Sequence, residues 1–206
     1  MTDLSKEVFR KLIHLLEVPI IVGFSLLQFY FSRQIAILSL TGLLLLLLEI
    51  EYIRIDYQTH IGSQITNFFS KLLRRRERNN IISSIFFIIS TIIAFSAFDY
   101  SIALLALLLT VFGDLTASIM GTAFGKKKIF RNKSYVGTIA GFIVNVIIGW
   151  IILPDYPTIF LPMAATASIV ETLTQKLDDN LTVPLFAGFI GQLILFFFKI
   201  PLPSLF

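Results

Sequence analysis

The sequence predicts an all-α integral membrane protein, a bundle of about seven transmembrane helices with its N-terminus in the cytoplasm. Hydrophobic residues make up 56% of the 206 residues, and the mean hydropathy of +0.84 is too high for a soluble domain. Apolar stretches close to the ~20 residues that cross a bilayer recur along the chain. The length fits one polytopic membrane domain over residues 1–206.

Seven apolar segments are expected to be the transmembrane helices. They cover residues 12–31, 34–53, 81–98, 100–121, 135–153, 158–176 and 181–198. The first contains Pro19, which is expected to kink it, and the second contains the leucine run 43–48. The third and fifth are uncharged, whereas the fourth carries Asp114 and the sixth carries Glu171. An acid inside a membrane is costly, so both acids are candidate functional residues.

The placement of the basic residues orients these helices. On the seven-helix topology, every lysine and arginine except Arg33 and Lys199 falls on one side of the membrane. Basic residues favour the cytoplasmic side, so the N-terminus is expected inside and the C-terminus outside.

The residue types exclude some chemistry. There are no cysteines, so a disulfide, a thiol nucleophile and a zinc–thiolate site are all excluded. We expect no cleavable signal peptide, because the first apolar segment carries His14 and Glu17 and no small-residue cleavage site follows it.

The longest cytoplasmic loop, residues 54–80, is expected to contain an interfacial amphipathic helix. Its apolar residues at helical spacing are Ile61, Ile65, Phe68, Phe69, Leu72 and Leu73. The basic run 74–78 follows them. Such a helix lies on the inner leaflet, where it recognises anionic lipid or simply anchors the topology, and we favour the anchor.

A second loop, residues 121–136, combines glycines with five cations. The cations are Lys126, Lys127, Lys128, Arg131 and Lys133. Glycines let backbone approach a ligand and clustered cations hold phosphate, which indicates a nucleotide-binding loop. The alternatives are that the cations only set the topology and that the glycines only permit close helix packing.

The other polar groups of the predicted topology gather at the same membrane face. They are Arg10, Lys11, His14, Glu51, Arg54, Asp114, Glu171, Asp178, Asp179 and Asn180. Glu51 and Arg54 are three residues apart and could instead form a local ion pair, and His14 could be a plain interfacial residue. The convergence nevertheless favours one site for a polyphosphate and its metal.

Phosphoryl transfer needs the groups that this face provides. Cations must surround the phosphates, which suits Lys133 and the lysines at 126–128. Carboxylates must hold a metal and a group must accept a proton, which suits Asp114, Glu171 and Asp179. Backbone amides freed near Gly137, at the start of the fifth helix, could also bind phosphate.

The same residues resemble the CTP-dependent polyprenol kinase family, which includes dolichol, phytol and CTP-dependent diacylglycerol kinases. Its motif DxxAxxxGxxxG is matched by Asp114, Ala117, Gly121 and Gly125. The second half of the motif has the form K-[ST]-x-E-G. It is matched at Lys133, Ser134 and Gly137, and Thr138 and Gly141 continue it. The pattern RKxxH lies at Arg10, Lys11 and His14, ExxR lies at Glu51 and Arg54, and Glu171, Asp179, Asn180 and Pro184 resemble the C-terminal part. One departure is Val136, which stands where the family often has Glu.

This resemblance implies an integral, multi-pass membrane kinase with its active site on the cytoplasmic face. It would transfer the γ-phosphoryl group of CTP to a long-chain isoprenoid alcohol of the dolichol, phytol or geranylgeraniol type. The implied catalytic residues are Asp114, His14 and Glu171, and the implied Mg²⁺ ligands are Asp114, Glu171 and Asp179. The nucleotide-binding residues would be Ala117, Gly121, Gly125, Lys126, Lys127, Lys128, Lys133, Ser134, Gly137 and Thr138.

Two other functions remain open on the sequence. A membrane cytidylyltransferase that makes a CDP-lipid would use the same groups on a different phosphate. A small transporter would use Asp114 and Glu171 as a proton relay, but transporters usually place their site near the midplane between internal repeats. No repeat is visible here, and the polar groups crowd one face.

Overall fold

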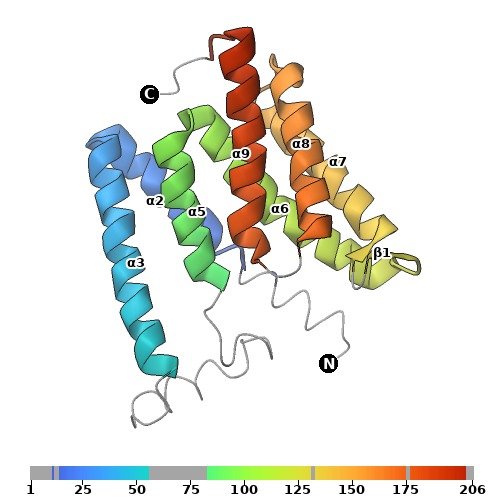
Figure 1. Cartoon of the computed structure of the whole chain (residues 1–206), viewed down its shortest axis with the longest axis horizontal. Helices are drawn as coiled ribbons and strands as arrows, with labels where there is room; N and C mark the ends of the chain where they lie inside the picture. Colours follow the sequence, from blue (N-terminus) through green and yellow to red (C-terminus); the bar gives the residue numbers. More distant parts are fainter. Residues whose placement is uncertain (1–10, 12–13, 56–82, 131–132, 175–176, 203–206) are drawn as a thin grey trace.

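The computed structural model describes residues 11, 14–55, 83–130, 133–174 and 177–202. Within these ranges the chain forms seven helices and one two-stranded hairpin (Figure 1). The helices are α2 (Glu17–Tyr30), α3 (Arg33–Ile55), α5 (Ser83–Ala97), α6 (Tyr100–Phe124), α7 (Tyr135–Ile152), α8 (Pro157–Leu173) and α9 (Asp179–Phe198). Each corresponds to one of the seven expected apolar segments, which confirms the all-α fold class.

The expected segment 12–31 contains a turn at residues 15 and 16, between the helical residue His14 and the start of α2 at Glu17. Pro19 lies in the first turn of α2, where a missing backbone N–H breaks no helical hydrogen bond.

Short polar side chains begin three of the helices. Asp99 Oδ1 accepts a hydrogen bond from the backbone N–H of Ser101 at the start of α6. Ser134 caps α7 and Asp178 caps α9 in the same manner. Such caps satisfy amides that lack a partner in the first turn, so they fix where each helix starts.

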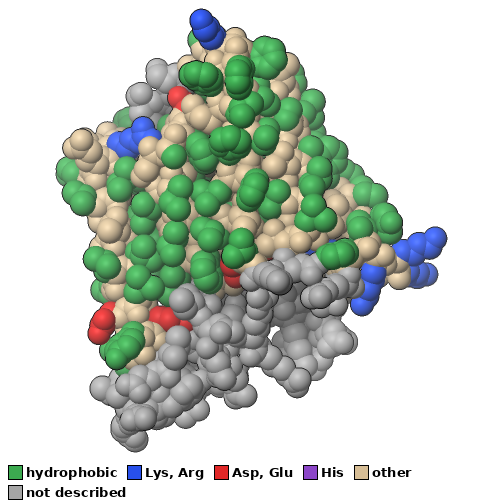
Figure 2. All heavy atoms as spheres, in the orientation of Figure 1, with side chains coloured by type: hydrophobic (Ala, Val, Ile, Leu, Met, Phe, Trp, Pro, Cys, Tyr) green, Lys and Arg blue, Asp and Glu red, His purple; other side chains and the backbone are tan. Residues whose placement is uncertain are grey.

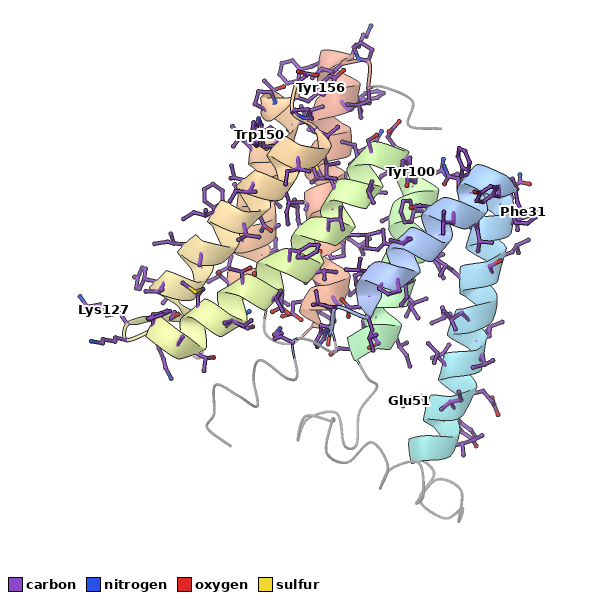
Figure 3. All side chains as sticks on the ribbon, turned by 180° about the vertical axis from the view of Figure 1, so that it is seen from behind. Phe31, Glu51, Tyr100, Lys127, Trp150 and Tyr156 are labelled. Atoms are coloured by element: carbon purple, nitrogen blue, oxygen red, sulfur yellow. The ribbon has the colours of Figure 1, made fainter. Side chains whose placement is uncertain are left out.

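The helices have the lengths and compositions of membrane spans. Among the described residues, α3, α6, α7 and α9 are long and apolar enough to cross a bilayer, and α2, α5 and α8 are shorter apolar helices. Hydrophobic side chains cover most of the visible flank in Figure 2. Trp150 and Tyr156 lie at one end of the molecule and Lys127 and Glu51 at the other (Figure 3). Which end faces the cytoplasm stays a prediction.

Helix α6 lies at the centre of the bundle. One core cluster packs it against α7, α8 and α9, and a second packs it against α2, α3 and α5. Accordingly, 61% of its most apolar window is buried, compared with 33% for α9 and less for α3 and α7. The central position explains how one acid on α6 can meet groups from several other segments.

Small residues bring α6 and α7 into close contact. A Cβ placed on Gly141 would lie 3.1 Å from Ala117 Cβ and 3.2 Å from the Gly113 carbonyl oxygen. A Cβ on Gly137 would lie 2.5 Å from the Ala117 carbonyl oxygen. The two helices therefore pack backbone against backbone at the end where they meet the hairpin.

The 121–136 loop is more ordered than the sequence indicates. Strands β1 (Lys128–Phe130) and β2 (Lys133–Ser134) pair antiparallel between α6 and α7, with Lys128 opposite Ser134. By contrast, residues 56–82 lie outside the described ranges, so the interfacial helix over 54–80 stays a prediction.

Candidate active site

A cavity of about 530 Å³ opens where α6, the hairpin, α7 and the start of α9 meet. Its lining residues are Lys11, Asp114, Ala117, Ser118, Gly121, Thr122, Gly125, Lys128, Lys133, Ser134, Gly137, Thr138 and Asp179. Most of these were expected from the sequence to bind nucleotide or metal. The cavity therefore joins the two halves of the predicted motif with Lys11 from the N-terminal segment.

Glycines make room for the hairpin against α6. A side chain on Gly121 would approach Ser134 Oγ to 3.1 Å, and one on Gly125 would collide with the same hydroxyl and with the Gly121 carbonyl oxygen. The absence of these side chains lets β2 and the start of α7 lie against the last turn of α6, and it leaves part of the cavity wall as bare backbone.

The first amides of α7 have partners inside the protein. The Tyr135 N–H donates to the Lys127 carbonyl at 3.2 Å, and the Gly137 N–H donates to Ser134 Oγ at 3.1 Å. These two groups are therefore not available to a phosphate in this conformation, contrary to the expected role of the amides near Gly137. Side-chain cations are the better candidates for phosphate binding.

Asp114 is buried and forms an ion pair with Lys11. The Lys11 ammonium donates to Asp114 Oδ2, and Ser118 Oγ donates to Asp114 Oδ1 at 3.3 Å. Lys11 is only 1% exposed and Asp114 only 6%. The pair compensates two charges that would each be costly to bury alone.

Lys133 forms a second ionic cluster at the cavity. Its Nζ lies 2.7 Å from Glu171 Oε1 on α8 and 4.0 Å from Asp179 Oδ2 on α9. Burial alone lowers the pKa of Lys133, but the nearby carboxylates, Glu171 foremost, outweigh it and hold the pKa above its ordinary value. Lys133 thus carries its charge at every physiological pH.

Several predicted site residues lie elsewhere. Lys126 and Lys127 are exposed and do not line the cavity, although they belong to the same loop as Lys128. Glu51 is buried on α3, on the opposite side of the molecule from Lys127 (Figure 3). The side chains of Arg10 and Arg54 lie outside the described part of the chain. Val136 is 38% exposed and does not line the cavity.

His14 and Asn180 adjoin the cavity without lining it. His14 Nδ1 lies 3.1 Å from Glu17 Oε1, and Asn180 Nδ2 donates to the same oxygen at 3.4 Å. Glu17 is 3% exposed and was not among the predicted site residues. Its position three residues after His14, on the same face of the helix expected over residues 12–31, is the signal that could have identified it.

Two cavity residues on α6 were also missed as ligand contacts. Ser118 and Thr122 line the cavity at four and eight residues after Asp114, so all three share one face of the helix. Hydroxyl side chains are common in membrane helices, so of these three residues only Asp114 indicates a function from the sequence alone.

The carboxylates do not form a metal site made of protein groups alone. Among the described residues no three His, Cys, Asp or Glu side chains are grouped closely enough to hold an ion. The cavity presents only Asp114 and Asp179. This set fits Mg²⁺, which is commonly held by one or two carboxylates, substrate phosphates and water.

Comparisons with known proteins agree with the motifs. The CTP-dependent diacylglycerol kinase 1 of Saccharomyces cerevisiae is 25% identical over 155 residues, 62% of this chain and 53% of that protein. The protein of the same name from Schizosaccharomyces pombe is 30% identical over 142 residues, 60% of this chain and 65% of that protein. The probable phytol kinase 2 of rice is 36% identical over 100 residues, 40% of this chain and 32% of that protein. The chain is similar to CTP-dependent lipid kinases.

The predicted resemblance is thereby confirmed. The chain spans about half the length of the curated relatives that it matches. No family model matches it, and no solved structure matches it either.

Proposed function

We propose that this chain is a membrane-embedded kinase that transfers the γ-phosphoryl group of CTP to the hydroxyl of a lipid alcohol. The observation that supports this most strongly is the cavity between α6, α7 and the hairpin. It combines three cations, Lys11, Lys128 and Lys133, with the carboxylates of Asp114 and Asp179. The relatives named for CTP-dependent lipid kinases support the nucleotide and the kind of acceptor.

The cations would bind the triphosphate, which carries about four negative charges. Lys133 and Lys128 line the cavity from the hairpin, and Lys11 lines it from the N-terminal segment. Charge-assisted hydrogen bonds to phosphate are stronger than neutral ones, especially where water is excluded. Lys126 and Lys127 would add only long-range attraction, because neither lines the cavity.

Asp114, with Asp179 or Glu171, would hold the Mg²⁺ ion that accompanies the nucleotide. When bound, the metal would neutralise charge that develops on the phosphates. The Lys11 ammonium now occupies one oxygen of Asp114. We propose that on nucleotide binding a phosphate replaces this carboxylate oxygen as the partner of Lys11.

In the transfer itself, the hydroxyl oxygen of the lipid forms a bond to the γ-phosphorus. The bond from that phosphorus to the bridging oxygen breaks, which leaves a lipid phosphate and CDP. The hydroxyl proton passes to His14 or to one of the acids around the cavity. The lipid would enter sideways from the bilayer, and we place the site on the cytoplasmic face because of the basic residues at that end.

We propose a long-chain isoprenoid alcohol as the acceptor, of the dolichol, phytol or geranylgeraniol type. Diacylglycerol is the second candidate, because three of the relatives are named as diacylglycerol kinases. Both acceptors carry a primary hydroxyl on an apolar body, which suits a cavity at the membrane end of a helix bundle.

The decisive experiment supplies the purified protein in nanodiscs with each labelled nucleotide and a panel of lipid alcohols. A kinase yields a lipid phosphate and CDP. Release of pyrophosphate with a CDP-lipid would instead identify a cytidylyltransferase. Transfer from ATP but not CTP, or transfer to neither class of alcohol, would contradict the proposal.

A further inference from the structure

We propose that Glu17 is a positioning residue that holds the His14 ring so that its Nε2 atom accepts the proton of the lipid hydroxyl. This inference rests on the proposed kinase activity and assigns the proton acceptor within it. Glu17 carries no role in the motifs discussed above. It is a carboxylate in a membrane helix, and its burial at 3% exposure requires a physical reason.

The contacts of Glu17 supply that reason. Its Oε1 atom lies 3.1 Å from His14 Nδ1 and 3.4 Å from Asn180 Nδ2. An amide Nδ2 only donates, so Oε1 acts as an acceptor toward α9. The simplest arrangement has Oε1 accepting from the ring as well, with the proton on Nδ1. In a neutral imidazole this leaves Nε2 without a proton and able to take one.

Asn180 is itself held firmly at the start of α9. Its backbone N–H donates to Asp178 Oδ1 at 3.1 Å, and its carbonyl accepts from Ser90 Oγ at 2.8 Å. The side chain is 2% exposed. Glu17 is thus fixed from α5 and α9, so the orientation it imposes on His14 does not depend on the N-terminal segment alone.

The position of His14 is close to the proposed site of transfer. Lys11, three residues earlier, lines the cavity and pairs with Asp114. His14 is half-buried and lies near enough to Asp114 for the two groups to interact electrostatically.

The charged groups around this pair are few among the described residues. Lys11 precedes it in the chain, and Asp114 faces it from α6. These two neutralise each other as an ion pair. Glu17 Oε1 remains the hydrogen-bond partner of Nδ1 once the ring has accepted the proton from the lipid. The proton then leaves to solvent, and the ring returns to its starting form.

Nitrogen NMR of the labelled histidine tests the pairing without any turnover. The chain has two histidines, so a His60→Gln background leaves His14 as the only signal. In nanodiscs at alkaline pH we expect the proton on Nδ1 in the otherwise wild-type chain, and a mixture of tautomers in Glu17→Gln. A proton on Nε2 in the wild-type chain would overturn the proposal, whether or not any variant folds.

The kinetics of transfer test the role. General-base catalysis typically contributes ~10²- to 10⁴-fold, and we expect Glu17→Gln to lower kcat by about 10- to 100-fold while the KM for CTP stays unchanged. The matched control is Glu49→Gln, an exposed carboxylate on α3, which should leave kcat unchanged.

Failure of the proposed role of Glu17 can be distinguished from failure of the proposed kinase activity. A loss of thermal stability in Glu17→Gln with an unchanged kcat of the folded protein would mean that Glu17 is only structural, which rejects the proposal. If the wild type transfers no phosphoryl group, the proposed function fails by itself, and the NMR measurement still decides whether Glu17 holds the His14 ring.

Discussion

Lys133 Nζ lies 2.7 Å from Glu171 Oε1, so the hairpin is bound to α8 through two residues that are 38 positions apart in the chain. The same ammonium lies 4.0 Å from Asp179 at the start of α9. One cation thus joins the hairpin, α8 and α9 at the edge of the cavity. Its removal should affect both nucleotide binding and the two carboxylates that it neutralises.

We expect Lys133→Ala to lower kcat/KM for CTP by about 10- to 100-fold, because a charge-assisted contact is worth roughly 1.5–3 kcal/mol. Steady-state kinetics in nanodiscs measure this loss. Lys199→Gln, an exposed lysine at the other end of the bundle, is the matched control. Normal turnover of Lys133→Ala would mean that the hairpin cations only set the topology.

The Lys11–Asp114 pair predicts a stability effect that can be separated from activity. Asp114→Asn should destabilise the protein, since it leaves the 1% exposed Lys11 ammonium without its carboxylate. Breaking a buried pair costs about 3–5 kcal/mol. The double variant Asp114→Asn with Lys11→Met should recover most of the lost thermal stability but no turnover. A single variant as stable as the wild type would show that the two side chains do not pair.

The same variants test the metal. The wild type should gain thermal stability from Mg²⁺–CTP, because a ligand that binds only the folded state stabilises it. Asp114→Asn with Lys11 intact should gain less, because Mg²⁺ prefers carboxylate oxygens. An equal gain would exclude Asp114 as a metal ligand.

The contact between α6 and α7 predicts different responses from two glycines. Gly137→Ala should lower the unfolding free energy by about 1–3 kcal/mol, because the added Cβ would meet the backbone of α6 at 2.5 Å. Gly42→Ala on α3 meets nothing within 4 Å and should be neutral or slightly stabilising. Chemical or thermal unfolding in detergent compares them, and equal effects would contradict the backbone-to-backbone packing.

Topology can be tested directly because the chain has no cysteines. A cysteine in place of Lys127 should react with an impermeant reagent only from the cytoplasmic side. One in place of Asp155, which is exposed in the connection from α7 to α8, should react only from outside. Labelling of both positions from the same side would rule out the predicted orientation.

The sequence alone was enough to predict the helices and most of the residues that line the cavity. A run of apolar residues must be helical in a bilayer, since the backbone has no other partners there, so α3 and α5 to α9 lie close to their expected ranges. The spacing of Asp114, Ala117, Gly121 and Gly125 is likewise local, because a helix puts such positions on one or two adjacent faces. The hairpin strands were missed because they are only two and three residues long.

Only the tertiary structure decided which charged and polar side chains contact one another. Lys11 pairs with Asp114 across 103 residues, and Asn180 reaches Glu17 across 163. Hydropathy determines that a segment is a helix, but it says nothing about which helices are neighbours or which way a lysine at a loop end turns. For that reason the sequence grouped Lys126, Lys127 and Lys128 together, whereas the hairpin directs only Lys128 into the cavity. The sequence did not single out Glu17 as a site residue for the same reason, because its contact with Asn180 depends on how α9 packs.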